Sequence, residues 1–191
     1  MFRERYISLV AGYASYHQDF RNKLAHFIGI PMLIIASIYI GSVPSFRFGG
    51  EVAGLSISLA LVLYVCSNLV WFVFDRPFAL VLAVVFAPFL WLCLDWTDHV
   101  VGLNPILGMP ANLAVFLLLF IAGWFFQLLG HYFEGKRPAF VDNLLQGFMG
   151  PTFLVYEVAV QLGMRQELSE KVESEMERLQ EATAAGKVDQ E

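Results

Sequence analysis

The sequence predicts an all-α integral membrane protein: a bundle of about four transmembrane helices, a re-entrant or interfacial helical hairpin, and an amphipathic C-terminal helix. Hydrophobic residues make up 58% of the 191-residue chain and charged residues only 15%, whereas about a quarter of an average soluble domain is charged. Residues 52–74 and 77–94 contain no charged side chain. Uncharged apolar runs of about 18 residues are long enough to cross a hydrocarbon core of ~30 Å. A soluble chain of this length would lack the polar surface to cover several such helices.

The N-terminal part, residues 1–23, is polar and of mixed charge. It lacks the basic start, short apolar run and small-residue cleavage site that mark a removable signal peptide. Asp19 is the expected N-cap of a helix that begins near Phe20, because its carboxylate can accept hydrogen bonds from backbone N–H groups of the first turn. On that helix Asn22 and His26 are four residues apart and share one face.

Four apolar segments follow, separated by connections that contain proline or glycine. Pro31 in the first segment and Pro88 in the third are expected to bend their helices, because proline lacks a backbone N–H. The connections are Ser42–Gly50, Asp75–Pro77 and Asp95–Pro110. The predicted spanning segments are Leu24–Gly41, Val52–Phe74, Phe78–Leu94 and Asn112–Phe133.

A fifth apolar run, Leu144–Met164, is a weaker candidate for a transmembrane helix. It contains Gly147, the pair Gly150-Pro151 and the charged Glu157. These residues favour a re-entrant or interfacial helical hairpin, with a fifth span as the alternative.

The chain divides into a membrane-embedded domain, residues 1–165, and an acidic tail, residues 166–191. The tail carries eight acidic and three basic residues, which account for the net charge of −5, and nothing in the chain predicts nucleic-acid binding. Its apolar residues recur at intervals of three and four, which predicts an amphipathic helix that is solvated or supports a homo-oligomer. These residues are Leu168, Val172, Met176 and Leu179.

The distribution of basic residues predicts the topology. With four crossings, seven basic residues fall on the side of the N-terminus and only Arg47 on the other side, so the positive-inside rule places the N-terminus in the cytoplasm. His99 falls on the opposite side, whereas the other three histidines fall together near the cytoplasmic interface. The seven basic residues are Arg3, Arg5, Arg21, Lys23, Arg76, Lys136 and Arg137.

The three grouped histidines predict a metal site. His131 and Glu134 are three residues apart at the end of the fourth apolar segment and share a helix face. His17 and His26 are nine residues apart, half a turn out of phase on one continuous helix. They can face one site only if a helix begins between them, as the proposed Asp19 cap allows. Ionisable residues at such a depth in a membrane protein are functional candidates.

The types of side chain limit the metals that such a site would bind. Cys66 and Cys93 lie inside apolar segments, so neither a disulfide nor a thiolate zinc site is predicted. Imidazoles with at most one carboxylate suit iron(II), zinc or copper. Four histidines are too few for the paired clusters of large di-iron membrane oxygenases.

Two separated motifs resemble those of the small membrane 2-hydroxy-fatty-acid dioxygenases, and the resemblance spans about residues 6–165. It implies an iron(II)-dependent, haem-free α-oxidation, in which a long-chain 2-hydroxy fatty acid and O₂ give a fatty acid one carbon shorter. In fungi this reaction serves breakdown of the phytosphingosine chain. The motifs are Tyr16-His17, Asn22, His26, Gly29 and Pro31, then Gln127, Gly130-His131, Glu134, Pro138-Ala139 and Asp142-Asn143.

The resemblance also implies roles for individual residues. His17, His26 and His131 would be the iron ligands, and Glu134 a fourth ligand or a partner that orients an imidazole. The substrate's carboxylate and 2-hydroxyl would chelate the iron and leave a position for O₂, with the acyl chain between the helices. Further catalytic candidates are Asn22 and Gln127, and the head-group candidates are Lys136, Arg137 and Asn143.

Two other functions remain open from the residues alone. One is a zinc-dependent membrane lipid hydrolase, which would need no O₂. The other is a non-enzymatic lipid-binding membrane protein whose histidines only anchor it at the interface. The predicted topology fits a bacterial inner membrane and an endoplasmic reticulum equally.

Overall fold

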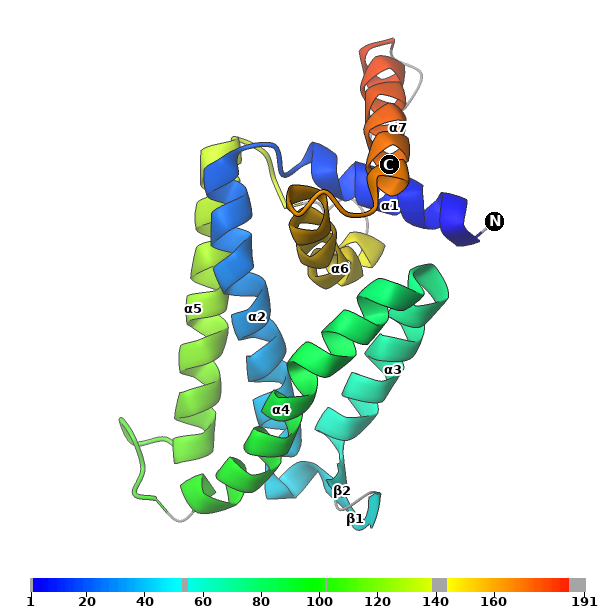
Figure 1. Cartoon of the computed structure of the whole chain (residues 1–191). Helices are drawn as coiled ribbons and strands as arrows, with labels where there is room; N and C mark the ends of the chain where they lie inside the picture. The colour runs from blue at the N-terminus through cyan, green and yellow to red at the C-terminus, as the bar shows by residue number, and fades with distance from the viewer. Residues whose placement is uncertain (1, 53–54, 102, 139–143, 186–191) are drawn as a thin grey trace.

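The computed structural model describes residues 2–52, 55–101, 103–138 and 144–185, and Figure 1 shows their arrangement. A 3₁₀ turn, Pro44–Phe46, and two short antiparallel strands, β1 (Arg47–Val52) and β2 (Leu55–Ser58), separate α2 from α3. The helices are α1 (Phe2–Ser15), α2 (Phe20–Ser42), α3 (Leu59–Phe74), α4 (Arg76–Val101), α5 (Ala111–Glu134), α6 (Leu144–Gln161) and α7 (Gln166–Ala184).

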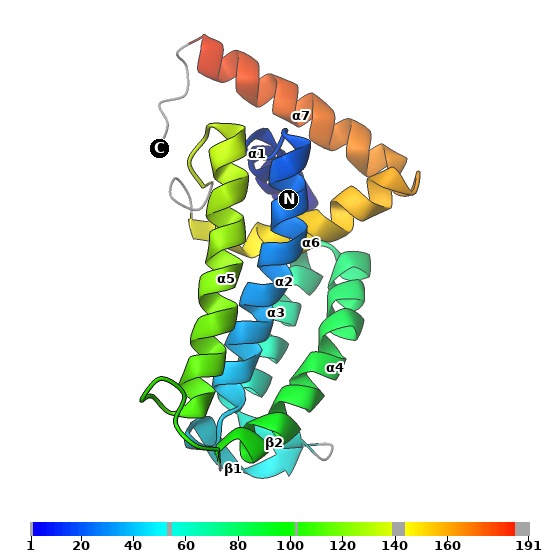
Figure 2. The ribbon, with the colours of Figure 1, turned by 90° about the vertical axis from the view of Figure 1, so that its left-hand side faces the viewer.

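Helices α2 to α5 form a bundle in which successive helices run in opposite directions (Figures 1 and 2). Helices α1, α6 and α7 gather at the end of the bundle where α2 begins and α5 ends. The strands β1 and β2 lie at the other end. Helices α2, α4 and α5 are long and apolar enough to cross a membrane. The prediction of an all-α membrane bundle is therefore confirmed.

The second predicted span, Val52–Phe74, is longer than the helix that forms. Helix α3 begins at Leu59, where the Ser58 hydroxyl caps it by accepting a hydrogen bond from the Leu61 backbone N–H at 3.2 Å. Its 16 residues rise only ~24 Å, less than the ~30 Å of a hydrocarbon core. The bundle thus has three helices of full spanning length and a shorter fourth one, because the start of the segment pairs as a strand.

Helix α4 extends through Val101, so the predicted polar connection Asp95–Pro110 is partly helical. Arg47 hydrogen-bonds to this polar end of α4. Its guanidinium donates to the Asp98 carboxylate at 2.9 Å and to the Leu94 carbonyl at 2.7 Å. Arg47, which was predicted to lie in a loop, therefore links strand β1 to the end of α4.

The fifth apolar run forms one helix, α6, which continues through Pro151 and lies across the end of the bundle (Figure 2). The predicted helical hairpin is wrong, because its glycine and proline residues lie within this single helix. Glu157, the charge that disfavours a span, forms an ion pair with Lys23 of α2 at 2.8 Å. This pair joins α6 to the first turn of α2.

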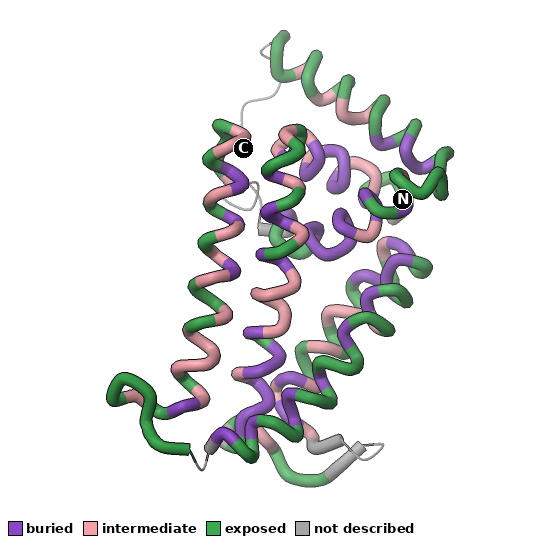
Figure 3. The backbone as a smooth tube through the Cα atoms, turned by 60° about the vertical axis from the view of Figure 1, so that its left-hand side comes forward, coloured by how far each residue is buried: buried purple, intermediate pink, exposed green. Residues whose placement is uncertain are grey.

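Helix α1 has no counterpart among the predicted elements, although it is largely buried (Figure 3). Its apolar side chains recur at three- and four-residue spacing and pack against α6 and α7. The tail helix α7 buries Leu168 and Val172 in the same cluster, so the apolar face considered for self-association is covered within the chain. The α1 residues in this cluster are Tyr6, Leu9, Val10, Ala11, Tyr13 and Ala14.

Helices α2 and α5 pack together over their whole length, and glycines allow them to approach closely. A Cβ atom on Gly29 would lie 2.8 Å from the Gly123 carbonyl oxygen and 2.5 Å from Gln127 Nε2. A Cβ atom on Gly130 would lie 3.0 Å from His26 Nδ1. Only the absence of side chains at these positions lets the two helices bring His26 and Gln127 to one site.

We predict that Gly29→Leu separates α2 from α5 and destabilises the protein. Overpacking a close contact costs about 1–3 kcal/mol, so the melting temperature in detergent should fall by several degrees. Ile28→Leu is the matched control, because Ile28 is adjacent in α2 and exposed. An unchanged melting temperature for Gly29→Leu would show that the close approach is not required.

Candidate metal centre

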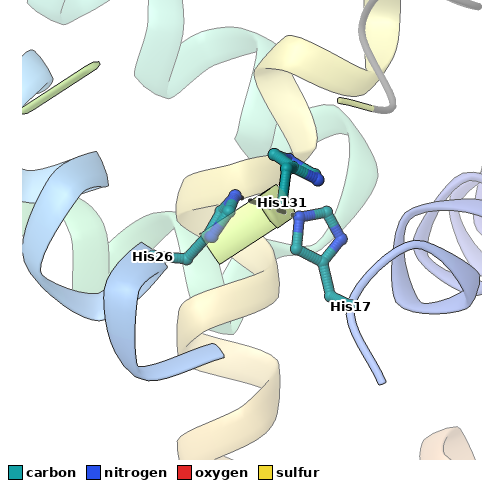
Figure 4. Close-up of side chains that lie close together, drawn as sticks. All are labelled: His17, His26 and His131. Carbon is teal, nitrogen blue, oxygen red and sulfur yellow. Dashed lines mark hydrogen bonds between the residues drawn. The ribbon is translucent and has the colours of Figure 1, made fainter. Parts of the chain in front are cut away.

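Three histidines from separate parts of the chain meet at the end of the bundle that α1 and α6 cover (Figure 4). His17 lies in the connection between α1 and α2, His26 in the second turn of α2, and His131 in the last turn of α5. Asp19 caps α2 by accepting a hydrogen bond from the Arg21 backbone N–H at 2.7 Å. A new helix thus begins between His17 and His26, which removes the phase conflict in the sequence.

The nitrogen edges of the three imidazoles converge. One nitrogen from each ring lies within 4.8 Å of the other two, and all three residues are buried. Each pair of rings is close to perpendicular, with interplanar angles between 69° and 86°. The rings are therefore T-shaped pairs instead of stacked ones, and one nitrogen of each ring lies close to the other two.

Backbone carbonyls fix the protonation of two of these rings. His17 Nδ1 donates to the Tyr13 carbonyl at 2.6 Å, and His26 Nδ1 donates to the Asn22 carbonyl at 3.0 Å. In neutral rings the Nε2 atoms then carry lone pairs, and these two atoms are only 3.0 Å apart. Two lone pairs that face each other at this distance repel unless a cation lies between them.

A divalent metal would relieve this repulsion. Burial is the main cause that lowers the pKa of the His17 imidazole from 6.5 to about 2, and the nearby His26 is the second cause. Protonation of His17 is therefore unfavourable at neutral pH. His131 Nδ1 is buried and has no hydrogen-bond partner among the described residues. Two ligands at right angles on a metal with bonds of ~2.1 Å would be ~3.0 Å apart, which matches the His17–His26 spacing. The donor set fits a transition-metal ion.

Glu134 hydrogen-bonds to residues that lie next to His17 in the connection between α1 and α2 and at the start of α2. Its carboxylate accepts hydrogen bonds from the backbone N–H groups of Gln18 at 3.0 Å and Asp19 at 2.8 Å, and from Asn22 Nδ2 at 3.0 Å. The last turn of α5 is thereby fastened to the connection that carries His17. Both carboxylate oxygens thus bind the connection and the start of α2, and the role of Glu134 as a fourth ligand or as a partner that orients an imidazole stays a prediction.

Two of the predicted polar residues are buried beside the histidines. Asn22 is fully buried and also donates to the Tyr16 carbonyl at 3.0 Å, so it helps to shape the connection. Gln127 lies one turn before His131 on α5, and its Nε2 has no hydrogen-bond partner in the part of the chain that the structure describes. Gln127 is thus a buried hydrogen-bond donor next to the three histidines.

Lys136 and Arg137, which were predicted to bind the head group of the substrate, are exposed and not buried beside the histidines. Lys136 donates to the Ser15 carbonyl at 2.7 Å, at the exposed end of α1, so its charge is used outside the histidine cluster. Arg137 is exposed, and Asn143 lies outside the described residues. His99 lies at the opposite end of the bundle, near the end of α4, as the topology predicted.

A largely apolar cavity of about 530 Å³ adjoins the histidines. Its volume falls within the range of pockets that bind small organic ligands. His17, His131 and Gln127 lie in its wall, and it continues along α2 as far as Ile38. Since α2 rises ~1.5 Å per residue, the eight residues from Ile30 to Ile38 alone give it a depth of roughly 12 Å. A long acyl chain could lie in this cavity with its polar end at the histidines.

Sequence reasoning missed two residues in the cavity wall, Tyr13 and Gln146. The Tyr13 ring stacks on the His17 ring, with centroids 4.0 Å apart and planes 5° apart. The spacing of apolar residues in α1 could have revealed Tyr13. Gln146 of α6 is buried, and its Oε1 has no partner among the described residues. No local signal identifies Gln146, because its neighbours come from α1.

We predict that Glu134→Ala destabilises the protein and weakens metal binding. The substitution leaves two backbone N–H groups and the Asn22 amide without their acceptor, at a cost of about 1–3 kcal/mol. Glu134→Gln, which keeps one acceptor oxygen, should retain more of the stability. Thermal unfolding with and without added metal measures both effects. Equal stability of Glu134→Ala and the wild type would contradict this role.

Comparisons with known proteins show which family the chain belongs to. Residues 3–162 match the family described as 2-hydroxy-palmitic acid dioxygenase Mpo1-like. The chain is 32% identical over 168 residues to the 2-hydroxy-palmitic acid dioxygenase MPO1 of Saccharomyces cerevisiae, with 86% of each chain covered. No solved structure matches the chain. The match covers α1 to α6, including all three histidines, and the chain therefore belongs to the Mpo1-like dioxygenase family.

Proposed function

We propose that this protein is an iron(II)-dependent dioxygenase that shortens a long-chain 2-hydroxy fatty acid by one carbon. The observation that carries the proposal is the pair of imidazole Nε2 atoms 3.0 Å apart, whose other nitrogens both donate to backbone carbonyls. This arrangement supports a metal cation between the rings. The yeast relative is a 2-hydroxy-palmitic acid dioxygenase, which supports the substrate class and the use of oxygen.

His17, His26 and His131 would hold the iron. Bound iron(II) would supply the electron transfer by which O₂ reacts with an organic substrate. Three histidine ligands would leave room at the metal for the substrate and O₂. The backbone carbonyls of Tyr13 and Asn22 keep two imidazoles in the tautomer that presents Nε2 to the metal.

The chemistry balances with O₂ as the only other reactant. The bond between the carboxyl carbon and C2 breaks, the carboxyl carbon leaves as CO₂, and C2 becomes the new carboxyl carbon. The substrate loses four electrons, which reduce the O₂ molecule: one oxygen atom enters the new carboxyl group and the other leaves as water.

The cavity would hold the acyl chain. Burying methylene groups contributes ~0.8 kcal/mol each, so a long chain could anchor the substrate without strong head-group contacts. The aromatic side chains of Trp71, Phe86 and Trp124 contribute to this apolar wall. A substrate dissolved in the membrane would bring its carboxylate to the interface at the histidine end.

The orientation in the membrane is part of the proposal. The excess of basic residues near the N-terminus and after α5 supports a cytoplasmic position for the histidine end. The membrane would be a bacterial inner membrane or an endoplasmic reticulum. In a eukaryotic cell the same reaction would serve breakdown of sphingolipid-derived 2-hydroxy fatty acids.

The direct test is turnover of 2-hydroxyhexadecanoic acid by protein loaded with iron(II). We expect consumption of about one O₂ for each pentadecanoic acid formed, and at least a 100-fold loss of rate in His26→Ala, since removing a ligand would abolish the metal site. His99→Ala should retain the wild-type rate, because His99 lies at the other end of the bundle. Full activity of His26→Ala, or lipid hydrolysis with zinc and without O₂, would contradict the proposal.

A further inference from the structure

Two glutamines with an unpartnered amide atom line the cavity beside the histidines. Gln127 of α5 and Gln146 of α6 are each more than nine-tenths buried. Gln127 Nε2 and Gln146 Oε1 have no hydrogen-bond partner among the described residues. A buried polar atom without a partner costs about 1–3 kcal/mol. Two such atoms on one cavity indicate a ligand that accepts from the first and donates to the second.

Contacts with α1 place Gln146 at the histidine end of the cavity. Its Nε2 lies 2.9 Å from the position of a Cβ on Gly12, so Gly12 provides the space for this amide. One turn later on α6, a Cβ on Gly150 would lie 3.2 Å from the Tyr13 hydroxyl oxygen. Because the Tyr13 ring stacks directly on His17, this face of α6 borders the metal centre.

A 2-hydroxy acid carries both an acceptor and a donor of the kind that the two amide atoms lack. Its carboxylate can accept a hydrogen bond from Gln127 Nε2, and its hydroxyl can donate one to Gln146 Oε1. A fatty acid without the hydroxyl could satisfy only Gln127. The lysine that was expected to bind the head group, Lys136, instead donates to the Ser15 carbonyl outside the cavity.

We propose that Gln146 recognises the 2-hydroxyl group of the substrate and makes the site selective for 2-hydroxy acids. The inference rests on the proposed function and adds the residue that accepts a hydrogen bond from the substrate's hydroxyl. The shortened product has lost the hydroxyl, so Gln146 Oε1 loses its partner after the reaction and the product binds more weakly than the substrate.

Sites that hydrogen-bond a substrate hydroxyl reject analogues that lack it, because a buried polar group is then left unpaired. Replacing Gln146 with methionine keeps a similar length and removes the acceptor. Hexadecanoic acid should then bind more tightly, and 2-hydroxyhexadecanoic acid more weakly. The ratio of their dissociation constants should change by roughly 10-fold or more, as one lost buried hydrogen bond implies.

The experiment measures the dissociation constants of both acids for the full-length protein, loaded with zinc so that no oxidation occurs. The fluorescence of Trp71 and Trp124, which line the cavity, reports binding. Two variants accompany Gln146→Met. Gln146→Glu keeps an acceptor oxygen in place and should preserve the ratio of the two constants. Ser37→Ala removes a hydroxyl farther along the same cavity, eleven residues after His26 on α2, and should also preserve it.

Loss of the preference in Gln146→Met, with the preference kept in Gln146→Glu and Ser37→Ala, would support the proposal. An unchanged ratio in Gln146→Met, with an unchanged melting temperature, would overturn it. So would an equal loss in Ser37→Ala. If the wild type still converts 2-hydroxyhexadecanoic acid, only the role of Gln146 fails. If the wild type neither converts this acid nor prefers it, the proposed function fails and this inference fails with it.

Discussion

The close approach of α2 and α5 is the constraint on which the candidate metal centre depends. Gly29, Gly123 and Gly130 lie where the two helices touch, and side chains at these positions would meet the backbone or site residues of the other helix. In lipid, apolar faces gain little from each other, so helix association relies on such close packing. The approach places His26 and His131 opposite each other. Glu134 then fastens the connection that carries His17 to the end of α5.

Much of the site could be predicted from the sequence because it depends on local signals and topology. Charge-free segments indicated the membrane bundle, and alternating crossings placed three histidines at one end and His99 at the other. The capping preference of Asp19 indicated that a helix begins between His17 and His26. The structure contains that cap and brings the three imidazoles together. Their role as iron ligands stays a prediction.

The errors concern features that depend on tertiary packing. Helix α1 was not predicted because residues 1–23 are polar and of mixed charge, although the recurrence of Tyr6, Val10 and Tyr13 is helical. Strand β2 pairs with β1, whose Arg47 contacts α4 at a residue about fifty positions later in the chain. The position of Gln146 in the cavity wall depends on the space that Gly12 of another helix leaves for its amide. A single sequence does not contain these neighbours.

The measurement that tests the account most directly is the metal content of protein purified in detergent without oxygen. Mass spectrometry of the wild type should find about one iron per chain. Protein with His17→Ala, His26→Ala or His131→Ala should contain little iron, whereas His99→Ala should keep it. Absence of bound metal from folded wild-type protein, or full retention of iron by all three variants, would contradict the assignment of these histidines as a metal centre.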